Sequence, residues 1–276
     1  MAFRMAKKAR SLGAKIVTGK AVQKILADQA KGQADGVLLA DGTEVFCDYV
    51  VPACDMSVTF GRLLPREKMG SLLRQMYEDR RAYPVYNTFQ TAMAVDSPEN
   101  PLETETIWNC PELIFTKGMS ERVTVKSYAY EPGFAPAGKQ LIQTLQGGSE
   151  EVYSYWIRLY QDPVAYQRQK SLLAERTREM LEEHFPALRG RLRVLDAWTP
   201  MTYTRYCSAY KGFYQAFSIS KYSAKLPYPS AYVEGVENVV LAGQWLNPPG
   251  GLPGSATAGK FAIQRILKKE GKNFHL

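Results

Sequence analysis

The sequence predicts an α+β fold, in which strands and helices occupy separate stretches of the chain. The dipeptide Asp41-Gly42 lies between two runs with strand character and predicts a β-hairpin. Four strand patterns follow one another farther along, at residues 85–95, 106–115, 123–130 and 140–145. Two long helical patterns come only after them. This arrangement is typical of a mixed or antiparallel sheet that helices cover.

The first 57 residues predict a helix followed by a small group of strands. The helix spans residues 2–12 and ends at Gly13, a residue type that is common just after a helix. The predicted strands are residues 15–17, 21–26, 36–40 and 43–51. We expect the last three to form an antiparallel meander, with the hairpin turn between the final two.

The middle of the chain adds helices to the four strands. One helix is predicted at residues 67–77, before the strands. Two more are predicted at residues 150–159 and 163–184, where apolar residues recur at helical spacing. Residues 131–138 are rich in Pro and Gly and predict a loop, and residues 191–195 predict a further strand.

The chain ends in a short buried strand, a loop and a helix, which together have the layout of a ligand cradle. The strand begins at Val239, and the helix covers residues 256–269. The first backbone N–H groups of a helix lack partners within it, and the peptide dipoles place about half a positive charge there. Gly250, Gly251 and Gly254 remove side chains that would keep an anionic or carbonyl-rich ligand away. The same glycines also fit a tight strand-to-helix turn that binds nothing.

The segment GQWLNPPGGLPGSATAGKFAIQRI, residues 243–266, resembles the C-terminal flavin-binding segment of FAD-dependent oxidoreductases related to phytoene dehydrogenase, and more broadly of amine oxidase-like flavoproteins. The resemblance implies that FAD is the cofactor. It also implies that the segment contacts FAD through Gly243, Gln244, Trp245, Gly250, Gly251, Leu252 and Gly254, with Trp245 against the flavin. Many members carry an acidic residue at the position of Gln244. An amide there still bonds a hydroxyl, without the charge-assisted part of the interaction.

The opening of the chain resembles the same family. The segments GAKIVTGKAVQKI and GVLLADGTEVFCDYVV are similar to its meander region, and the resemblance implies that the backbone at Val22 meets the adenine of FAD. The family begins with a Gly-x-Gly-x-x-Gly turn that grips the pyrophosphate, and this chain has no such motif. The chain therefore resembles roughly the second half of a full-length member. The missing half would be lost from a fragment or supplied by a partner polypeptide.

The resemblance divides the chain into three parts. Residues 1–57 would be a partial FAD-binding domain, and residues 58–233 the substrate-binding domain. Residues 234–276 would be the C-terminal FAD-binding segment. We expect the first and third parts to pack together.

Tyrosines gather near the end of the predicted substrate-binding domain, at Tyr203, Tyr206, Tyr210 and Tyr214. They follow a Thr-Pro-x-Thr sequence, residues 199–202, that is similar to the family's turn near the flavin ring. The resemblance implies that these tyrosines line a substrate pocket over the flavin. Tyrosines also complete ordinary cores, with the hydroxyl group at the surface. No side chain stands out as a general base, so the catalytic residues stay unknown.

Composition excludes several other classes of protein. The two histidines and four widely spaced cysteines lack metal-ligand spacing, so we expect no metal site, and His184 fits a cation at the end of a helix. Free cysteines favour the reducing cytoplasm.

The net charge is +8, but the basic residues are scattered, which argues against a nucleic acid partner. No apolar run reaches the roughly 20 residues that span a bilayer, so we expect at most peripheral membrane contact.

Two functional hypotheses follow. The first is the C-terminal part of an FAD-dependent oxidoreductase of the phytoene dehydrogenase type. Flavin hydride chemistry would then act on a small hydrophobic or conjugated substrate, or on an amine. The alternative is a truncated, non-catalytic substrate-binding or interaction module that cannot hold FAD alone. Its uncovered apolar faces would then favour a homo-oligomer.

Overall fold

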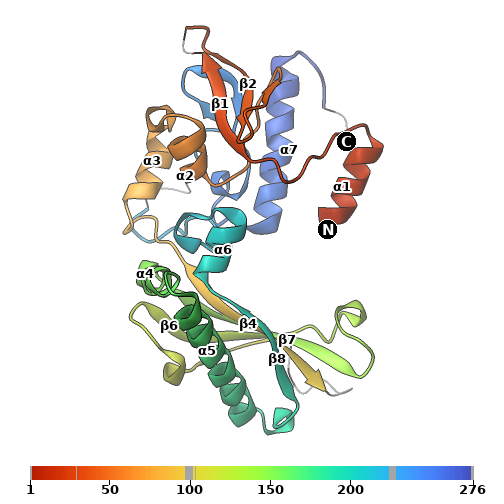
Figure 1. Cartoon of the computed structure of the whole chain (residues 1–276), viewed down its shortest axis with the longest axis vertical. Coiled ribbons are helices and arrows are strands. Elements are labelled where there is room, and N and C mark those ends of the chain that lie inside the picture. The colour runs from red at the N-terminus through yellow and green to blue at the C-terminus, as the bar shows by residue number, and fades with distance from the viewer. Residues whose placement is uncertain (1, 29, 97–101, 103, 224–227, 275–276) are drawn as a thin grey trace. The chain divides into compact units, whose positions relative to one another are not determined.

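The computed structural model describes residues 2–28, 30–96, 102, 104–223 and 228–274. The chain divides into two compact units, and each unit joins segments that lie far apart in the sequence. The first unit comprises Met1–Gly70, Ser230–Ala242 and Lys260–Leu276. The second comprises Ser71–Pro229 and Gly243–Gly259. The α+β class predicted from the sequence is confirmed (Figure 1).

A three-stranded antiparallel meander forms part of the first unit (Figure 1). Its strands, in their order across the sheet, are β1 (Val22–Asp28), β2 (Gln33–Leu39) and β3 (Glu44–Phe46). The predicted hairpin turn is confirmed, because the Leu39 N–H donates to the Thr43 carbonyl oxygen at 2.9 Å and Gly42 has a φ of +85°. Gly36 permits a close approach of two strands, since a Cβ there would lie 2.1 Å from the Val45 carbonyl oxygen.

The C-terminal strand pair belongs to the same unit. β9 (Tyr232–Val233) and β10 (Val236–Val240) pair antiparallel. Val50 forms an isolated parallel bridge with Val239. Segments near residues 50 and 239, far apart in the sequence, therefore lie side by side in the first unit.

Short helices complete the first unit. α1 (Ala2–Ser11) has the predicted start and contains no buried residue. The chain later forms α2 (Met56–Val58), a π-helical turn (Thr59–Leu63) and a 3-10 turn (Arg66–Lys68). Asp55 caps α2 by accepting from the Ser57 N–H.

A five-stranded antiparallel sheet is the centre of the second unit. Its strands, in their order across the sheet, are β5 (Glu105–Asn109), β6 (Met119–Ser127), β7 (Lys139–Gly148), β4 (Asn87–Asp96) and β8 (Leu192–Trp198). β4 and β7 pair without a register shift, whereas the pairing of β4 with β8 shifts between Ala92 and Met93.

Helices cover one face of this sheet. α4 (Glu150–Leu159) and α5 (Pro163–His184) lie against it (Figure 1). Phe89 and Met93 of β4 belong to the two core clusters on that side and are at most 3% exposed. Because side chains alternate along a strand, Thr88 and Gln90 point to the opposite face, away from α4 and α5.

The remaining elements of the second unit lie around the sheet. They include α3 (Ser71–Glu78), α6 (Pro200–Cys207) and the first residues of α7 (Gly251–Lys269). Single 3-10 turns occur at Pro111–Leu113, Pro132–Phe134, Pro186–Leu188, Tyr210–Gly212 and Gln244–Leu246. No helix in the described ranges is both long and apolar enough to cross a membrane.

Several element boundaries test the sequence-based predictions directly. α4 and α5 have the predicted bounds, residues 150–159 and 163–184. The strand predicted at residues 15–17 is wrong, because these exposed residues pair with no strand in the described part of the chain. The helix predicted at residues 67–77 is interrupted, since Gly70 separates a 3-10 turn from α3.

Other boundaries differ for local reasons. The strand predicted at residues 106–115 ends at Asn109, shortly before Pro111, which has no N–H for a ladder. The strand predicted at residues 43–51 is limited to β3, and Val50 contributes only its bridge. α6 replaces a predicted turn and begins with a capping box at Thr199.

The predicted domains were defined by the ligand that each would bind, whereas the two units of the structure are defined by packing. Residues 58–70 pack with the meander, in the first unit, although the prediction gave them to the substrate-binding domain. The assignment of residues 1–57 and 234–276 to flavin binding, and of residues 58–233 to substrate binding, stays a prediction.

Candidate functional site

The start of α7 is well suited to hold a ligand in the second unit. Gly250 and Gly251 have φ values of +85° and +79°, a backbone region that side chains disfavour. A Cβ at Gly250 would also lie 3.0 Å from the Cβ atoms of Ala216 and Gln244. Glycine is therefore needed for the close turn into α7, which begins at Gly251, five residues before the predicted residue 256.

The first turn of α7 presents backbone donors to open space. Leu252 is 72% exposed, and no acidic residue occurs in this turn. A Cβ built on Gly251 would meet nothing nearer than 3.9 Å. Within the described ranges, no hydrogen bond joins the N–H of Leu252 or Gly254 to a group outside the helix. These donors and the helix dipole suit an anionic or carbonyl oxygen.

Gln244 caps this helix from the preceding loop. Its Oε1 accepts from the Gly251 N–H at 3.1 Å. The side chain therefore uses its oxygen within the protein and keeps its Nε2 group as a donor. Gln244 therefore suits a ligand that has a hydrogen-bond acceptor beside it. A carboxylate at this position would instead suit a ligand that has a hydrogen-bond donor.

Trp245 lies in the core of the second unit. It is 3% exposed, and its ring centroid lies 5.7 Å from that of Phe217 and 6.1 Å from that of Phe213. Because Trp245 packs against these rings, it holds in place the 3-10 turn Gln244–Leu246, to which Gln244 belongs. Gly243, with a φ of +103°, allows the chain to enter that turn from β10. The structure thus leaves little of the Trp245 ring surface open to a ligand.

Uncharged polar side chains form a network on the face of the sheet opposite α4 and α5, where α6 contacts β4. The Tyr203 hydroxyl accepts from Gln90 Nε2 at 2.6 Å and from Trp198 Nε1 at 2.9 Å. Gln90 Nε2 also donates to Thr88 Oγ1 at 2.8 Å. Burial raises the pKa of Tyr203, although hydrogen bonds from Thr88 and Trp198 oppose the shift. Tyr203 therefore stays a neutral hydroxyl near pH 7.

The network continues across the sheet to the end of β6. Gln143 Nε2 donates to Gln90 Oε1 at 2.7 Å, and the Tyr128 hydroxyl donates to Gln143 Oε1 at 2.6 Å. We call the whole set the amide network, and its members are Thr88, Gln90, Tyr128, Gln143, Trp198 and Tyr203. Since every member is uncharged, the network offers hydrogen bonds without fixed charge.

The four predicted tyrosines do not form one surface. Tyr203 and Tyr214 meet edge to face at a centroid distance of 6.0 Å, and Tyr214 is 39% exposed. Tyr210 instead packs against Tyr77 at 5.0 Å. Tyr206 is 73% exposed and lies beside Arg205. The structure therefore brings together two of the four.

A charged cluster lies beside Tyr210. Arg80 Nε donates to Glu150 at 3.1 Å, and Arg80 Nη2 donates to the Tyr210 hydroxyl at 3.1 Å. Lys211, whose φ is +48°, donates to the same carboxylate. Burial acts to raise the pKa of Glu150, but its bonds to Lys211 and Arg80 outweigh burial and leave that pKa below its ordinary value. Sequence reasoning had no signal for this cluster.

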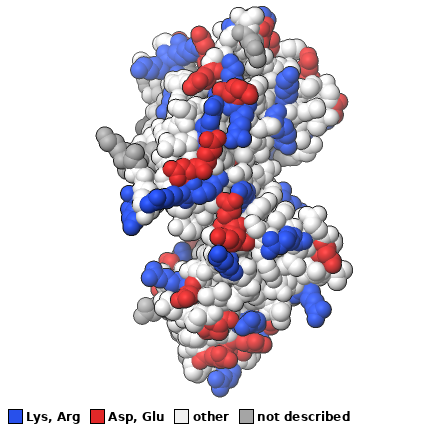
Figure 2. Space-filling view, turned by 90° about the vertical axis from the view of Figure 1, so that its left-hand side faces the viewer, with Lys and Arg blue, Asp and Glu red and all other residues white. Residues whose placement is uncertain are grey.

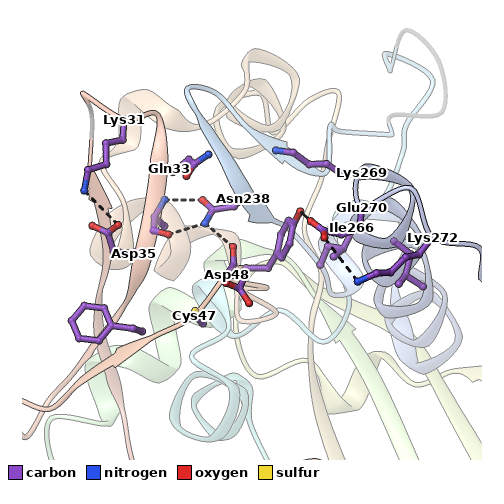
Figure 3. Close-up of a pocket in the computed structure, with 14 residues that line it drawn as sticks. Lys31, Gln33, Asp35, Cys47, Asp48, Asn238, Ile266, Lys269, Glu270 and Lys272 are labelled. Carbon is purple, nitrogen blue, oxygen red and sulfur yellow. Dashed lines mark hydrogen bonds and ion pairs between the residues drawn. The ribbon is translucent and has the colours of Figure 1, made fainter.

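Val22, the remaining predicted contact to FAD, lies in the first unit. It is the first residue of β1, is half-buried and pairs with Leu39. The same unit contains an open cavity of about 1220 Å³. Figure 3 shows its lining, in which residues of the meander, β10 and the end of α7 surround the opening.

Asn238 joins the walls of this cavity (Figure 3). Its Oδ1 accepts from the Ala34 N–H at 2.7 Å, and its Nδ2 donates to the carbonyl oxygens of Ala34 and Asp48. The Tyr49 hydroxyl donates to Glu270 at 2.6 Å, and this bond raises the pKa of Tyr49. Lysines and carboxylates alternate around the opening, so the cavity has no single charge preference.

Comparisons with known proteins show what the whole chain is similar to. Residues 2–267 match the family model of flavin containing amine oxidoreductases. The chain is similar to a Mus musculus protein described as pyridine nucleotide-disulfide oxidoreductase domain-containing protein 2, with 24% identity over 288 residues. The match covers 91% of this chain and 47% of the mouse protein, so the chain spans about half the length of that curated relative.

Solved structures share the fold. An oxidoreductase from Methanosarcina mazei has a TM-score of 0.54 and 18% identity, over 94% of this chain and 52% of that one. A redesigned putrescine oxidase has a TM-score of 0.56 and 10% identity, over 95% of this chain and 52% of that one. At such identities the likeness extends to the fold alone.

Proposed function

Because the chain belongs to the flavin containing amine oxidoreductase family, over residues 2–267, we propose that it is the flavin- and substrate-facing part of an FAD-dependent oxidoreductase of the phytoene dehydrogenase type. The open start of α7 carries this proposal. Its N–H groups at Leu252 and Gly254, which bond no acceptor outside the helix in the described ranges, follow two glycines in a conformation that allows the backbone to come close to a ligand.

The residues present fit a flavin. The Leu252 and Gly254 N–H groups would donate to phosphate or carbonyl oxygens of FAD, and Gln244 Nε2 would donate to a ring carbonyl or ribityl oxygen. The backbone at Val22 would meet the adenine. Bound flavin supplies hydride transfer, and the chain supplies orientation and hydrogen bonds. Trp245 would act from the core, by holding the Gln244 turn in place.

The substrate proposed here is a small, uncharged molecule that is hydrophobic or conjugated, or a neutral amine. The amide network carries no charge, and the aromatic rings of Trp198, Tyr203 and Tyr214 lie on or beside it. A face of this kind favours flat apolar groups with one or two hydrogen-bonding atoms. It offers no charged partner to an anionic substrate.

A dinucleotide-binding half is the proposed partner. The first unit exposes large apolar side chains that a complete flavin domain would cover, including Phe3 (92%), Leu12 (73%) and Phe46 (70%). The chain also spans about half of its relatives. We therefore expect the rest of the fold to complete FAD binding in the cytoplasm, as another part of a longer protein or as a partner chain.

Flavin titration tests the proposal. The chain, alone and co-expressed with the N-terminal half of the mouse relative, would be mixed with FAD and followed by flavin absorbance and fluorescence. We expect saturable uptake in at least one of the two. Gly254→Val should weaken it at least tenfold, about 1.4 kcal/mol, because the added side chain crowds the N–H donors.

Gly259→Val is the matched control. Gly259 lies in the same helix, and a Cβ there would meet nothing within 4 Å. Equal loss of flavin in both variants would point to helix destabilisation instead of a flavin site. No uptake by either preparation would contradict the proposal.

The alternative function, a non-catalytic interaction module, draws support from one observation. α1 contains no buried residue although it carries Phe3, and Leu12, which follows directly after it, is 73% exposed. A module of this kind would self-associate and would stay colourless even with the N-terminal half present. The same titration, with light scattering, separates the two functions.

A further inference from the structure

We propose that Cys110, Glu112 and His184 bind one divalent cation of borderline softness, with Zn²⁺ as the best match. This site is independent of the proposed oxidoreductase function, and it departs from the sequence-based expectation that the protein has no metal site.

Three side chains of different chemistry converge at this point of the second unit. One ligand atom from each residue lies within 4.8 Å of the other two. Cys110 follows β5, Glu112 lies in the next 3-10 turn, and His184 is the last residue of α5. Within the described ranges, no other group of three such ligands is found.

The ligand set matches zinc in type and size. Zinc prefers thiolate, imidazole and carboxylate ligands at about 2.0–2.3 Å in a tetrahedron, which places the ligand atoms roughly 3.5 Å apart. Atoms within 4.8 Å need to approach by about 1 Å, a distance that side-chain rotation covers. Glu112 and His184 are exposed, so water has access to the fourth position.

The surroundings orient the histidine as a metal ligand. His184 Nδ1 lies 3.1 Å from the Met180 carbonyl oxygen, which can only accept, so Nδ1 carries the proton. The neutral ring then has its lone pair on Nε2, and a carbonyl partner of this kind is common for zinc-bound histidine. The Trp108 ring, edge-on at a centroid distance of 5.6 Å, packs against the imidazole.

The other two ligands are held through their backbones. The Cys110 N–H donates to the Glu121 carbonyl oxygen at 2.6 Å. Arg176 of α5 donates to the Glu112 carbonyl oxygen at 2.7 Å, which fixes the turn against the helix. A bound ion would therefore link edge strand β5 to the end of α5 and stabilise the folded state by mass action.

His184 alone also fits a second role, as a cation at the C-terminal end of a helix. That role needs neither Cys110 nor Glu112. The cysteine and the carboxylate distinguish the two roles, because only a metal site depends on all three side chains.

Cobalt titration of the untagged, metal-free chain tests the site. Co²⁺ bound by a thiolate in a tetrahedral site gives an intense sulfur-to-metal charge-transfer band and visible d–d bands. We expect one equivalent to bind and Zn²⁺ to displace it. We also expect Zn²⁺ to raise the Tm of the chain, and EDTA to reverse the increase.

Variants decide which atoms bind the ion. Cys110→Ser should abolish the charge-transfer band, and His184→Gln and Glu112→Gln should each weaken binding by at least about tenfold. The last two residues are exposed, so these variants should fold even if Cys110→Ser does not. Cys207→Ser, at an exposed free cysteine, is the control and should leave binding unchanged.

The opposite results overturn the site. These are the absence of stoichiometric binding, a Co²⁺ affinity that is unchanged in the His184→Gln and Glu112→Gln variants, or a charge-transfer band that disappears with Cys207→Ser.

Discussion

At the scale of single residues, Gln90 organises the face of the sheet opposite α4 and α5. It is 1% exposed, and its amide bonds Tyr203, Thr88 and Gln143. This role could not be predicted from the sequence, because a glutamine in a strand pattern is typical of a solvent-facing position. Its partners Tyr203 and Gln143 lie 113 and 53 residues away, and only the strand order β7-β4-β8 brings them together.

The Tyr203 hydroxyl should be important for stability. Tyr203→Phe removes the shared acceptor from the buried amide of Gln90 and from the partly buried N–H of Trp198. We expect a loss of about 1–3 kcal/mol in the free energy of unfolding, measured in urea. Tyr206→Phe, at a position that is 73% exposed, should change that free energy by less than about 0.5 kcal/mol. Similar losses in both variants would contradict a structural role for the network.

Ionised Glu150 should contribute to the free energy of unfolding, and this contribution should be lost at acidic pH. Its pKa in the folded protein is below the ordinary value of 4.5, because bonds to Lys211 and Arg80 outweigh the opposing effect of burial. A carboxyl group with a lowered pKa stabilises the fold above its unfolded pKa, and that contribution is lost as the pH falls through the folded pKa. The side chain is 33% exposed, so screening keeps the contribution below about 1 kcal/mol.

Urea unfolding between pH 3 and pH 7 checks this dependence. Glu150→Gln should be less stable than the unchanged protein at pH 7, and the difference should shrink below about pH 4.5. Glu183→Gln, at an exposed position of α5, is the control and should show a small difference at every pH. A constant deficit for Glu150→Gln would mean that packing, not charge, explains its effect.

At the scale of elements, the predictions succeeded where local signals agree. α5 has Asp162 at its N-cap, Pro163 in its first turn and a Pro shortly after its end, so its bounds could be read from the sequence. α7 was predicted to start too late, because Gly251 and Gly254 look like loop residues in the sequence. The sequence does not show that Gln244 Oε1 accepts from the Gly251 N–H at the start of the helix. The false strand at residues 15–17 has strand-forming residues but no partner, and pairing cannot be read from a short local pattern.

The cap of α5 can be tested directly. Asp162 Oδ1 accepts from the N–H groups of Val164 and Ala165, at 2.9 and 3.1 Å. Asp162→Ala should therefore lower the free energy of unfolding by about 1 kcal/mol. Asp162→Asn keeps an oxygen acceptor and should retain most of the stability. Equal losses for the two substitutions, in urea unfolding at pH 7, would assign the effect to charge instead of capping.

At the scale of the whole molecule, the chain combines two self-contained units with surfaces of different kinds. Acidic and basic side chains are interspersed over the face drawn in Figure 2, so the net charge of +8 is spread out rather than gathered there. The first unit exposes the large apolar side chains of Phe3, Leu12 and Phe46, and such residues mark an interaction site where they gather into a patch. Their exposure is consistent with the finding that the chain spans about half the length of its relatives.

The last prediction concerns this apolar surface. The chain alone should associate in a concentration-dependent way in light scattering, because association removes exposed apolar side chains from water. Phe46→Lys, at a β3 position that is 70% exposed, should reduce the association. Phe134→Lys, at a 54% exposed position of the second unit, should not. Co-expression with the N-terminal half of the mouse relative should suppress association, since that half would cover the same surface. A chain that is monomeric at every concentration, or one for which both substitutions act equally, would mean that the first unit needs no covering partner.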